Sequence, residues 1–266
     1  MKTRFFYPIA AAVLLIAAGG NSAAQDVKGG VVKYKQITKY NFDTFYADRA
    51  RGDANTQAWL AALPKEHEQF KVLYFTENTA LYEEDPTAEE AAPDPNVQRA
   101  LMGMEGRGRG VRGGGSPPTV ELEKVFFDFE KNEKIQQVMF MTRNFLVSDS
   151  IRSEAWKLTN KMIKVLDYTC LGAEIVKGDT TITAWFTSEI PISTGPEMFF
   201  GLPGLILAIE INGETAFIAT SVDLTPPEEG VMSKPDKGEK MTQEEFDKTV
   251  EEKIKEWLKN RRIIRR

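Results

Sequence analysis

The sequence is poor in the residues that most often carry catalysis and bind metals. Its 266 residues include one cysteine, Cys170, and one histidine, His67. One cysteine excludes an internal disulfide, and these two residues lie too far apart for a metal-ligand motif. Because Cys170 sits in an alternating apolar stretch, a buried, unreactive thiol is the more common outcome. A Cys–His pair stays open, but we expect no enzyme, no catalytic residue, no metal and no cofactor.

Long apolar runs are also missing beyond the N-terminus. No later stretch approaches the roughly 20 apolar residues that a membrane helix needs, so we expect no transmembrane segment. At the N-terminus, Lys2 and Arg4 precede a short apolar core and then small residues that end at Ala24. This pattern is typical of a signal peptide over residues 1–24. Residues 25–266 are then expected to form a single exported domain, periplasmic or secreted.

Basic residues are outnumbered by acidic ones. The chain has 34 Lys and Arg against 39 Asp and Glu, a net charge of −5, and loss of Lys2 and Arg4 with the signal peptide would make it −7. An acidic protein is a poor general binder of nucleic acid, so we expect no nucleic-acid partner. The apolar content of 42% is sufficient for one substantial core.

Residues 83–119 differ in composition from the rest. Their first part is acidic and contains three prolines, and their second part, residues 106–115, is rich in Gly and Arg. Residues 108–113 fit G-x-G-x-x-G, but no predicted strand precedes them and no helix follows, so a nucleotide site is not indicated. Since neither part can form a packed face, we expect a disordered insertion.

Alternating apolar residues predict strands along most of the remaining chain. An edge strand is expected at residues 29–42, and a short helix at residues 58–63. Further strands are expected at residues 68–82, 120–129, 135–147, 156–159 and 162–166. Thr242 and Glu245 form a capping box at the start of an amphipathic C-terminal helix, at about residues 242–260.

Two tight turns predict the pairing of four more strands. Gly178-Asp179 joins residues 168–177 to residues 180–189. The expected opposed pairs are Leu171 with Phe186, Ala173 with Ala184, and Ile175 with Ile182. Asn212-Gly213 suits a two-residue type I′ turn. The expected opposed pairs there are Leu207 with Ile218, Ile209 with Ala216, and Ile211 with Glu214.

The stretch from Trp185 to Ile211 combines strand-like apolar residues with turn residues. Residues 202–205 fit a type II turn, with Pro203 at its second position and Gly204 at its third, where φ is positive. This turn is expected to determine where the following strand enters the sheet, and therefore which of its side chains face the core.

The hexapeptide Gly201-Leu202-Pro203-Gly204-Leu205-Ile206, with Trp185, Pro191 and Gly195-Pro196 ahead of it, resembles the signature of the GLPGLI family. These are exported proteins of Bacteroidetes-type bacteria, without an established activity. The structural signature residues implied by this resemblance are Pro191, Gly195, Pro196, Gly201, Pro203, Gly204, Leu205 and Ile206. The resemblance implies export and supplies no mechanism.

Four apolar residues of this stretch are candidates for ligand binding: Trp185, Phe199, Phe200 and Leu202. They could line a concave apolar site, since ligand pockets are mostly apolar. The alternative is that they fill the end of the sheet core, and this is favoured because core aromatics are more numerous than ligand contacts.

The expected fold is α+β and mostly β: one large, twisted antiparallel sheet with few helices, including one at the C-terminus. It is similar to the half-barrel of periplasmic lipoprotein-carrier proteins, although a fold does not determine function. We expect a non-enzymatic binding or carrier protein for a hydrophobic ligand or an exported chain. An accessory of an outer-membrane assembly, acting through a protein–protein surface, is the alternative. An enzyme of unknown class is the third.

Overall fold

A computed structural model describes residues 27–40, 42, 46, 50–89, 96–97 and 118–264 of the protein. The expected signal peptide and most of the expected insertion at residues 83–119 lie outside the described residues. Within the part of the chain that the structure describes, no helix has both the length and the apolar character that a membrane crossing requires.

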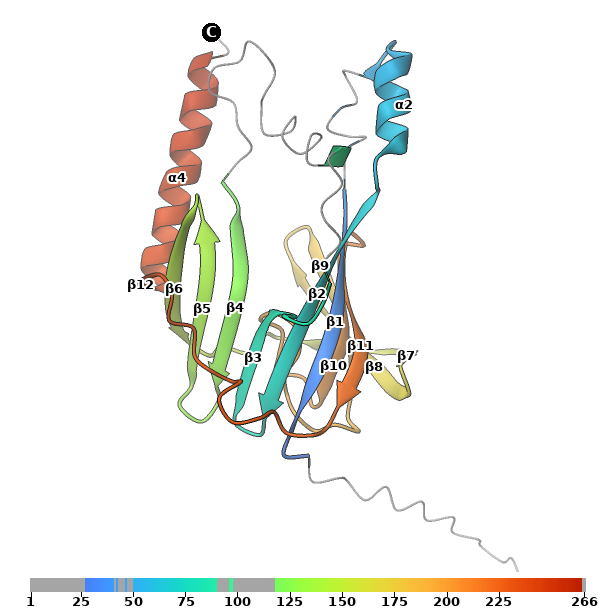
Figure 1. The fold of residues 1–266 in the computed structure, drawn as a ribbon, viewed down its shortest axis with the longest axis vertical. Coiled ribbons are helices and arrows are strands. Elements are labelled where there is room, and N and C mark those ends of the chain that lie inside the picture. The colour runs from blue at the N-terminus through green and yellow to red at the C-terminus, as the bar shows by residue number, and fades with distance from the viewer. Residues whose placement is uncertain are drawn as a thin grey trace, which may run out of the picture.

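Twelve strands form one open, curved sheet (Figure 1). The strands are β1 (Gly29–Lys39), β2 (Glu66–Thr76), β3 (Thr79–Glu84), β4 (Val120–Asp128), β5 (Glu133–Phe140), β6 (Arg143–Ser150), β7 (Lys157–Val165), β8 (Tyr168–Lys177), β9 (Thr180–Thr187), β10 (Leu205–Ile211), β11 (Thr215–Asp223) and β12 (Glu239–Thr242). Their order across the sheet is β12-β6-β5-β4-β3-β2-β1-β11-β10-β9-β8-β7. Two helices are described along their length, α2 (Ala54–Ala62) and α4 (Gln243–Ile264).

The predicted fold class is confirmed. The protein is mostly β, and every neighbouring pair of strands is antiparallel except β12 and β6, which are parallel. The few helices include the expected C-terminal one. The parallel pair exists because β12 reaches the sheet after a long connection rather than through a hairpin turn.

The first predicted hairpin has the expected register. Leu171 lies opposite Phe186, Ala173 opposite Ala184, and Ile175 opposite Ile182. The second is shifted by one residue: Ile211 lies opposite Thr215 and Ile209 opposite Phe217. Asn212 and Gly213 have positive φ angles of 52° and 68°, but Glu214 joins the loop as a third residue. The shift places Phe217 in the core and leaves Ile218 39% exposed.

The prediction of an edge strand at residues 29–42 is wrong. β1 lies inside the sheet, between β2 and β11. Val32 and Tyr34 are fully buried on one side. The lysines that give this segment its polar character form ion pairs. The Lys33 ammonium lies 2.9 Å from the Asp85 carboxylate, and the Lys35 ammonium lies 3.1 Å from the Glu68 carboxylate. Charged residues therefore occur in a central strand because its neighbours neutralise them.

Several predicted strand boundaries are also wrong. Residues 68–82 span two strands, β2 and β3, and residues 135–147 span β5 and β6. Conversely, the two short strands expected at residues 156–166 form one strand, β7, whose register shifts between Leu158 and Met162. The missed turn between β5 and β6 contains no Gly or Pro, although Met141 and Thr142 both have positive φ. Sequence signals for a turn are therefore weak there.

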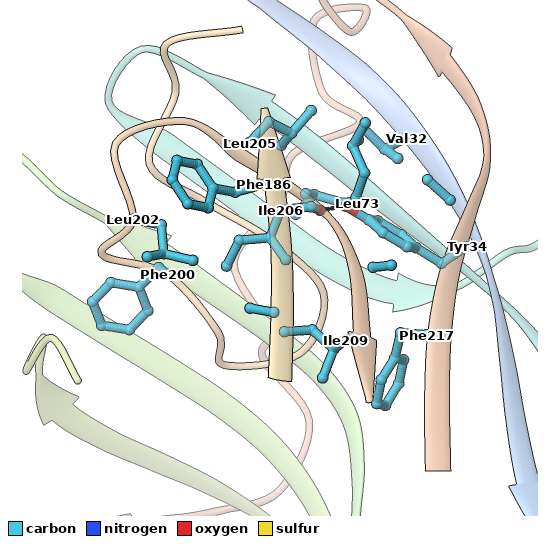
Figure 2. Packing of buried hydrophobic residues seen from close by; sticks show 14 of the residues in the cluster. Val32, Tyr34, Leu73, Phe186, Phe200, Leu202, Leu205, Ile206, Ile209 and Phe217 are labelled. Atoms are coloured by element: carbon cyan, nitrogen blue, oxygen red, sulfur yellow. Dashed lines mark hydrogen bonds between the residues drawn. The ribbon is translucent and has the colours of Figure 1, made fainter. Parts of the chain in front are cut away.

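The main core lies against one side of the sheet and draws on strands from both halves of the chain. Figure 2 shows Tyr34 and Leu73 from β1 and β2 close to Phe186, Ile206 and Phe217 from β9, β10 and β11. Each of these five side chains is at most 1% exposed. The Tyr34 hydroxyl donates a hydrogen bond of 2.6 Å to the carbonyl of Ile206. Burial of such large side chains supplies most of the favourable free energy of folding.

α2 lies beyond the ends of β1 and β2 (Figure 1), and its Leu60 belongs to a second, smaller core. The buried members of this core are Phe42, Tyr46, Leu60, Leu63 and Val97. Asp53 caps α2, since its carboxylate accepts a hydrogen bond from the Asn55 amide at 3.1 Å. The helix expected at residues 58–63 is present and begins earlier, at Ala54.

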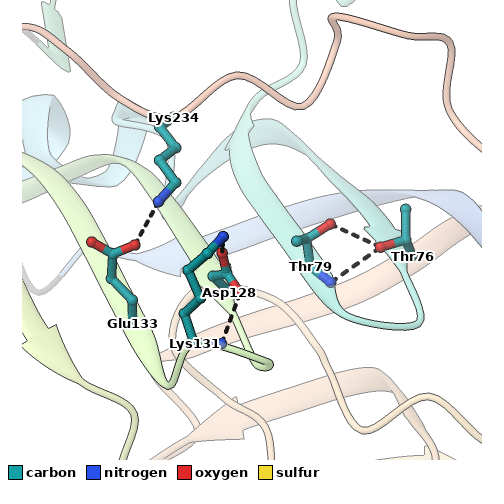
Figure 3. A network of polar contacts seen from close by, with 6 residues as sticks. All are labelled: Thr76, Thr79, Asp128, Lys131, Glu133 and Lys234. Atoms are coloured by element: carbon teal, nitrogen blue, oxygen red, sulfur yellow. Dashed lines mark hydrogen bonds and ion pairs between the residues drawn. The ribbon is translucent and has the colours of Figure 1, made fainter.

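After β11 the chain crosses the sheet to reach β12 at the far edge (Figure 1). Lys234, in this crossing, pairs with Glu133 (Figure 3). Its ammonium also lies 5.4 Å from the centre of the Phe126 ring. The same view shows Asp128 accepting a hydrogen bond from the backbone of Lys131, which closes the turn between β4 and β5. The crossing therefore contacts β4 and β5 on its way to the edge strand β12.

The predicted capping box begins α4. The Thr242 amide donates to the Glu245 carboxylate at 2.9 Å, and the Glu245 amide donates to the Thr242 hydroxyl at 3.3 Å. Phe246 then packs on Phe140 and Phe145, with ring centres 6.1 and 5.5 Å away. α4 extends to Ile264, beyond the expected end near residue 260.

Candidate ligand-binding groove

Residues 188–204, here called the signature loop, join β9 to β10 and fold back on both. The Leu205 amide donates to the carbonyl of Ile190 at 3.0 Å, and the Ile206 amide donates to that of Thr194 at 2.9 Å. Ile190 is fully buried. These hydrogen bonds satisfy backbone amides at the start of β10. The signature loop is therefore packed against the sheet and does not extend away from it.

The turn before β10 is tighter than the predicted type II turn. The Gly204 amide donates to the carbonyl of Leu202 at 2.8 Å, two residues back, around Pro203. Gly204 has a φ of 153°. A Cβ on this residue would lie 2.1 Å from the carbonyl oxygen of Thr187. Glycine is therefore required mainly by the close approach of two backbones, and only partly by the φ angle.

Phe200 and Leu202 are part of the core (Figure 2). Phe200 is 8% exposed, and the centre of its ring lies 5.3 Å from that of Phe127. Its carbonyl accepts a 2.8 Å hydrogen bond from the Trp156 indole. Phe199 is partly buried and contacts the same Trp156 edge-on, with the ring centres 6.3 Å apart. Leu202 is 2% exposed.

Trp185 lies apart from these three residues. Side chains alternate along β9, so Trp185 points to the opposite side of the strand from the buried Phe186. It is partly buried and forms part of a groove of about 460 Å³. The groove is lined by residues 163–166, Trp185, residues 208–210, and residues 216, 218 and 219. The structure therefore does not gather the four candidate residues in one site.

The groove exists because small residues lie beside large ones on one side of the sheet. Trp185 is opposite Ala208 on β10, and Ala208 is opposite Ile218 on β11. On its other side Trp185 is opposite Gly172, and a Cβ there would lie 3.0 Å from the indole ring. The Trp185 ring thus lies against Gly172, and the small side chain of Ala208 leaves space beside the ring.

The groove is mainly apolar and open to solvent. Ile163, Leu166 and Ile218 are 37%, 44% and 39% exposed. Lys164 and Glu210 are the two charged residues in the lining. Two larger hollows, of about 680 and 660 Å³, are lined mostly by charged and polar residues instead. The groove is thus suited to an apolar ligand, and two charged side chains are among its lining residues.

The histidine and the cysteine lie far from each other. Cys170 is on β8 and His67 on β2, with four strands between them in the sheet. Cys170 is fully buried, and burial raises the pKa of its thiol to about 11. His67 is exposed, with its ring 6.0 Å from that of Tyr40. Across the described ranges, no group of three or more His, Cys, Asp and Glu side chains is arranged to hold a metal ion.

The signature loop also carries a carboxyl group that the sequence did not single out. Burial raises the pKa of Glu197 to about 7, and nearby Lys71 opposes this rise. Tyr82 is within electrostatic range of Glu197. Lys71 and Tyr82 come from β2 and β3, far from Glu197 in the sequence. The Gly-Pro pair ahead of Glu197 was the one sequence signal near this group, and it indicated only a turn.

A family model described as "Protein of unknown function (Porph_ging)" matches residues 173–208, a region that contains Trp185 and the hexapeptide at residues 201–206. This match supports a Bacteroidetes-type family for that region. A search of the curated proteins found no match.

Two solved structures are similar to this chain, "Structure of PNGF-II in P21 space group" and "Structure of PNGF-II in C2 space group". Their TM-scores are 0.51 and 0.50, each with 13% identity over 85% of this chain. The matched region covers 34% and 33% of those chains, so this protein spans about a third of their length. At this level of identity the similarity extends to the fold alone.

Proposed function

We propose that the protein is a non-enzymatic binding or carrier protein whose groove beside Trp185 holds an apolar ligand. The supporting observation is the groove itself, since about 460 Å³ with a mainly apolar lining falls in the usual range for ligand sites. Its exposed Ile163, Leu166 and Ile218 side chains would lose contact with water when a ligand binds. The lining contains no Ser, Cys or His, which supports binding rather than catalysis.

The proposal includes export to the periplasm or the cell exterior and membership of the GLPGLI family. Support for export comes from the N-terminal pattern over residues 1–24. Support for the family comes from the literal hexapeptide at residues 201–206. The family-model match over residues 173–208 spans this hexapeptide but belongs to a different family description, so it does not single out the GLPGLI family. Trp185 lies in that matched region and also contributes to the groove.

A second candidate function is capture of an exported chain or an outer-membrane protein at strand β7. This strand ends the sheet, with β8 as its neighbour, and its Leu158 and Met162 are 59% and 65% exposed. An extended segment can add to such an edge through backbone hydrogen bonds. However, Lys157, Lys161 and the irregular register of β7 are features that protect edges from pairing. The apolar ligand therefore ranks first.

A titration with the neutral dye Nile red, followed by its fluorescence, tests the groove. We expect saturable binding to the native protein. Ala216→Leu should weaken it at least tenfold, because Ala216 shares a side of the sheet with Ile218 and a larger side chain would fill the groove. The control is Ala61→Leu, at an exposed position of α2.

Two results would contradict the proposal. One is an absence of saturable binding to protein that melts cooperatively. The other is an unchanged affinity in folded Ala216→Leu, which would place the dye elsewhere on the molecule.

A further inference from the structure

The groove beside Trp185 adjoins a smaller hollow on the same side of the sheet. This hollow, here called the acidic hollow, has a volume of about 230 Å³ and is lined by Glu210, residues 213–216, and residues of β1 and β2. Glu210 and Ala216 line both the groove and the acidic hollow. Glu210 lies opposite Ala216, and Ala216 lies opposite Ile37, so the three side chains form one row across β10, β11 and β1. The groove and the acidic hollow are therefore neighbouring parts of one depression in the sheet.

This depression changes from apolar to charged along β10. In the groove, Ala208 lies opposite Trp185 on one side and opposite Ile218 on the other. Glu210 is two residues beyond Ala208, so its side chain is on the same side of the sheet, about 7 Å further along the strand. An apolar row is thus followed directly by a charged one.

The acidic hollow contains three exposed carboxylates and one ammonium group. Glu66 and Glu214 join Glu210 in its lining. Within the described residues, none of these three carboxylates forms an ion pair within 4.0 Å. The ammonium group belongs to Lys39, which donates a 2.7 Å hydrogen bond to the carbonyl of Gly213. The lining of the acidic hollow therefore has an excess of negative charge.

Other glutamates in the same cross-strand row are paired. Glu68 on β2 and Glu174 on β8 belong to the row that contains Glu210. The Glu68 carboxylate lies 3.1 Å from the Lys35 ammonium, and the Glu174 carboxylate lies 3.0 Å from the Lys161 ammonium. Glu210 lies between these two pairs and has no such lysine among the described residues, so a cationic group of a ligand can take that place.

The charges of the depression indicate the class of ligand. Lys164 is the cation in the lining of the groove, and it lies on β7, with β8 and β9 between its strand and β10. An ammonium group beside Glu210 would be attracted by the three carboxylates, whereas a carboxylate there would be repelled. We propose that the groove and the acidic hollow together bind an amphiphile, with its apolar chain against Trp185 and its ammonium group beside Glu210. This inference rests on the proposed function, because it adds a head group to the apolar ligand of the groove.

The test is displacement of bound Nile red at pH 7 by three compounds with the same alkyl chain: octylammonium chloride, 1-octanol and sodium octanoate. We expect octylammonium to displace the dye at a concentration about tenfold lower than octanoate, with octanol between them. Added sodium chloride should narrow this difference, because exposed charges are screened by salt.

Glu210→Gln tests the position of the head group. Glu210 is exposed, so this variant should fold, and it should weaken octylammonium binding about fivefold while leaving octanol binding unchanged. The matched control is Glu121→Gln, which makes the same change of charge at an exposed position of β4. Four strands separate β4 from β10, so this control should leave the binding of all three compounds unchanged.

Two results would overturn this inference while leaving the proposed function in place. One is octanoate displacing Nile red as effectively as octylammonium. The other is an unchanged octylammonium affinity in Glu210→Gln, which would place the ammonium group elsewhere. Failure of the proposed function would differ, because neither Nile red nor any of the octyl compounds would then bind saturably in calorimetry, and both proposals would be overturned.

Discussion

At the scale of single residues, Glu197 connects the signature loop to the sheet electrostatically. Its carboxyl titrates near neutral pH because burial opposes the charged form more than Lys71 favours it. Tyr82, also buried, adds a second group whose ionisation Glu197 opposes. The protonated form of Glu197 is therefore more stable in the folded protein than in the unfolded chain.

This environment predicts an unusual dependence of stability on pH. The pKa of Glu197 is about 7 when folded and 4.5 in the reference state, so the folded state binds more protons between these values. Its contribution to stability is full below pH 4.5 and is lost as the pH rises through 7. Relative to Glu197→Gln, the native protein should lose on the order of 2–3 kcal/mol between pH 4.5 and 8.

Urea unfolding at pH 4.5, 6 and 8 measures this difference. Glu228→Gln, at an exposed position, is the control and should follow the native curve at every pH. Parallel curves for the native protein and Glu197→Gln would show that the carboxyl is as well solvated as in the unfolded chain.

At the scale of elements, the turn that leads into β10 depends on one close backbone contact. A Cβ at Gly204 would lie 2.1 Å from the Thr187 oxygen, where neither backbone can move without disturbing the pairing of β9 with β10. We therefore expect Gly204→Ala to destabilise the protein by about 3 kcal/mol or more, combining strain and overpacking. Gly204→Asn should be no milder, because the contact penalises any Cβ.

Gly178 provides a matched control for this prediction. It also has positive φ, 60°, but a Cβ there would meet nothing within 4 Å. Gly178→Ala should then cost only the backbone strain, about 1–2 kcal/mol. The midpoints of urea unfolding compare the two variants. Equal losses of stability would mean that the approach to Thr187 does not constrain the turn.

Local chemistry explains which elements could be predicted from the sequence. The β8–β9 hairpin and the α4 capping box follow from a few adjacent residues, and both are present as expected. The β10–β11 register could not be predicted because Glu214 has no residue-type signal for joining the loop. β12 was missed because its parallel pairing with β6 depends on a contact between segments far apart in the sequence.

The candidate sites were harder to predict for the same reason. Trp185 was identified by its aromatic character, but strand alternation places it on the opposite side of β9 from Phe186, where it lines the groove. The four candidates were grouped because they are close in sequence, whereas the groove is assembled from β7, β9, β10 and β11. Glu197 could not be identified from the sequence because its environment depends on Lys71 and Tyr82, which come near it only in the folded sheet.

At the scale of the whole molecule, we assign stability to the signature loop and ligand binding to the groove. The loop fills the core with Ile190, Phe200 and Leu202, so this side of the sheet has little room for a large apolar ligand. The other side of β9 keeps an open apolar groove, because alanine and glycine neighbour Trp185 there. Our account is therefore that the core aromatics provide stability and the groove provides binding.

Photolabelling with a neutral alkyl diazirine, followed by mass spectrometry of the labelled peptides, tests this account most directly. It predicts that labels concentrate on Ile163, Leu166, Trp185 and Ile218, and that excess Nile red reduces them. Labels on residues 199–202 that Nile red displaces, with the groove unlabelled, would contradict it.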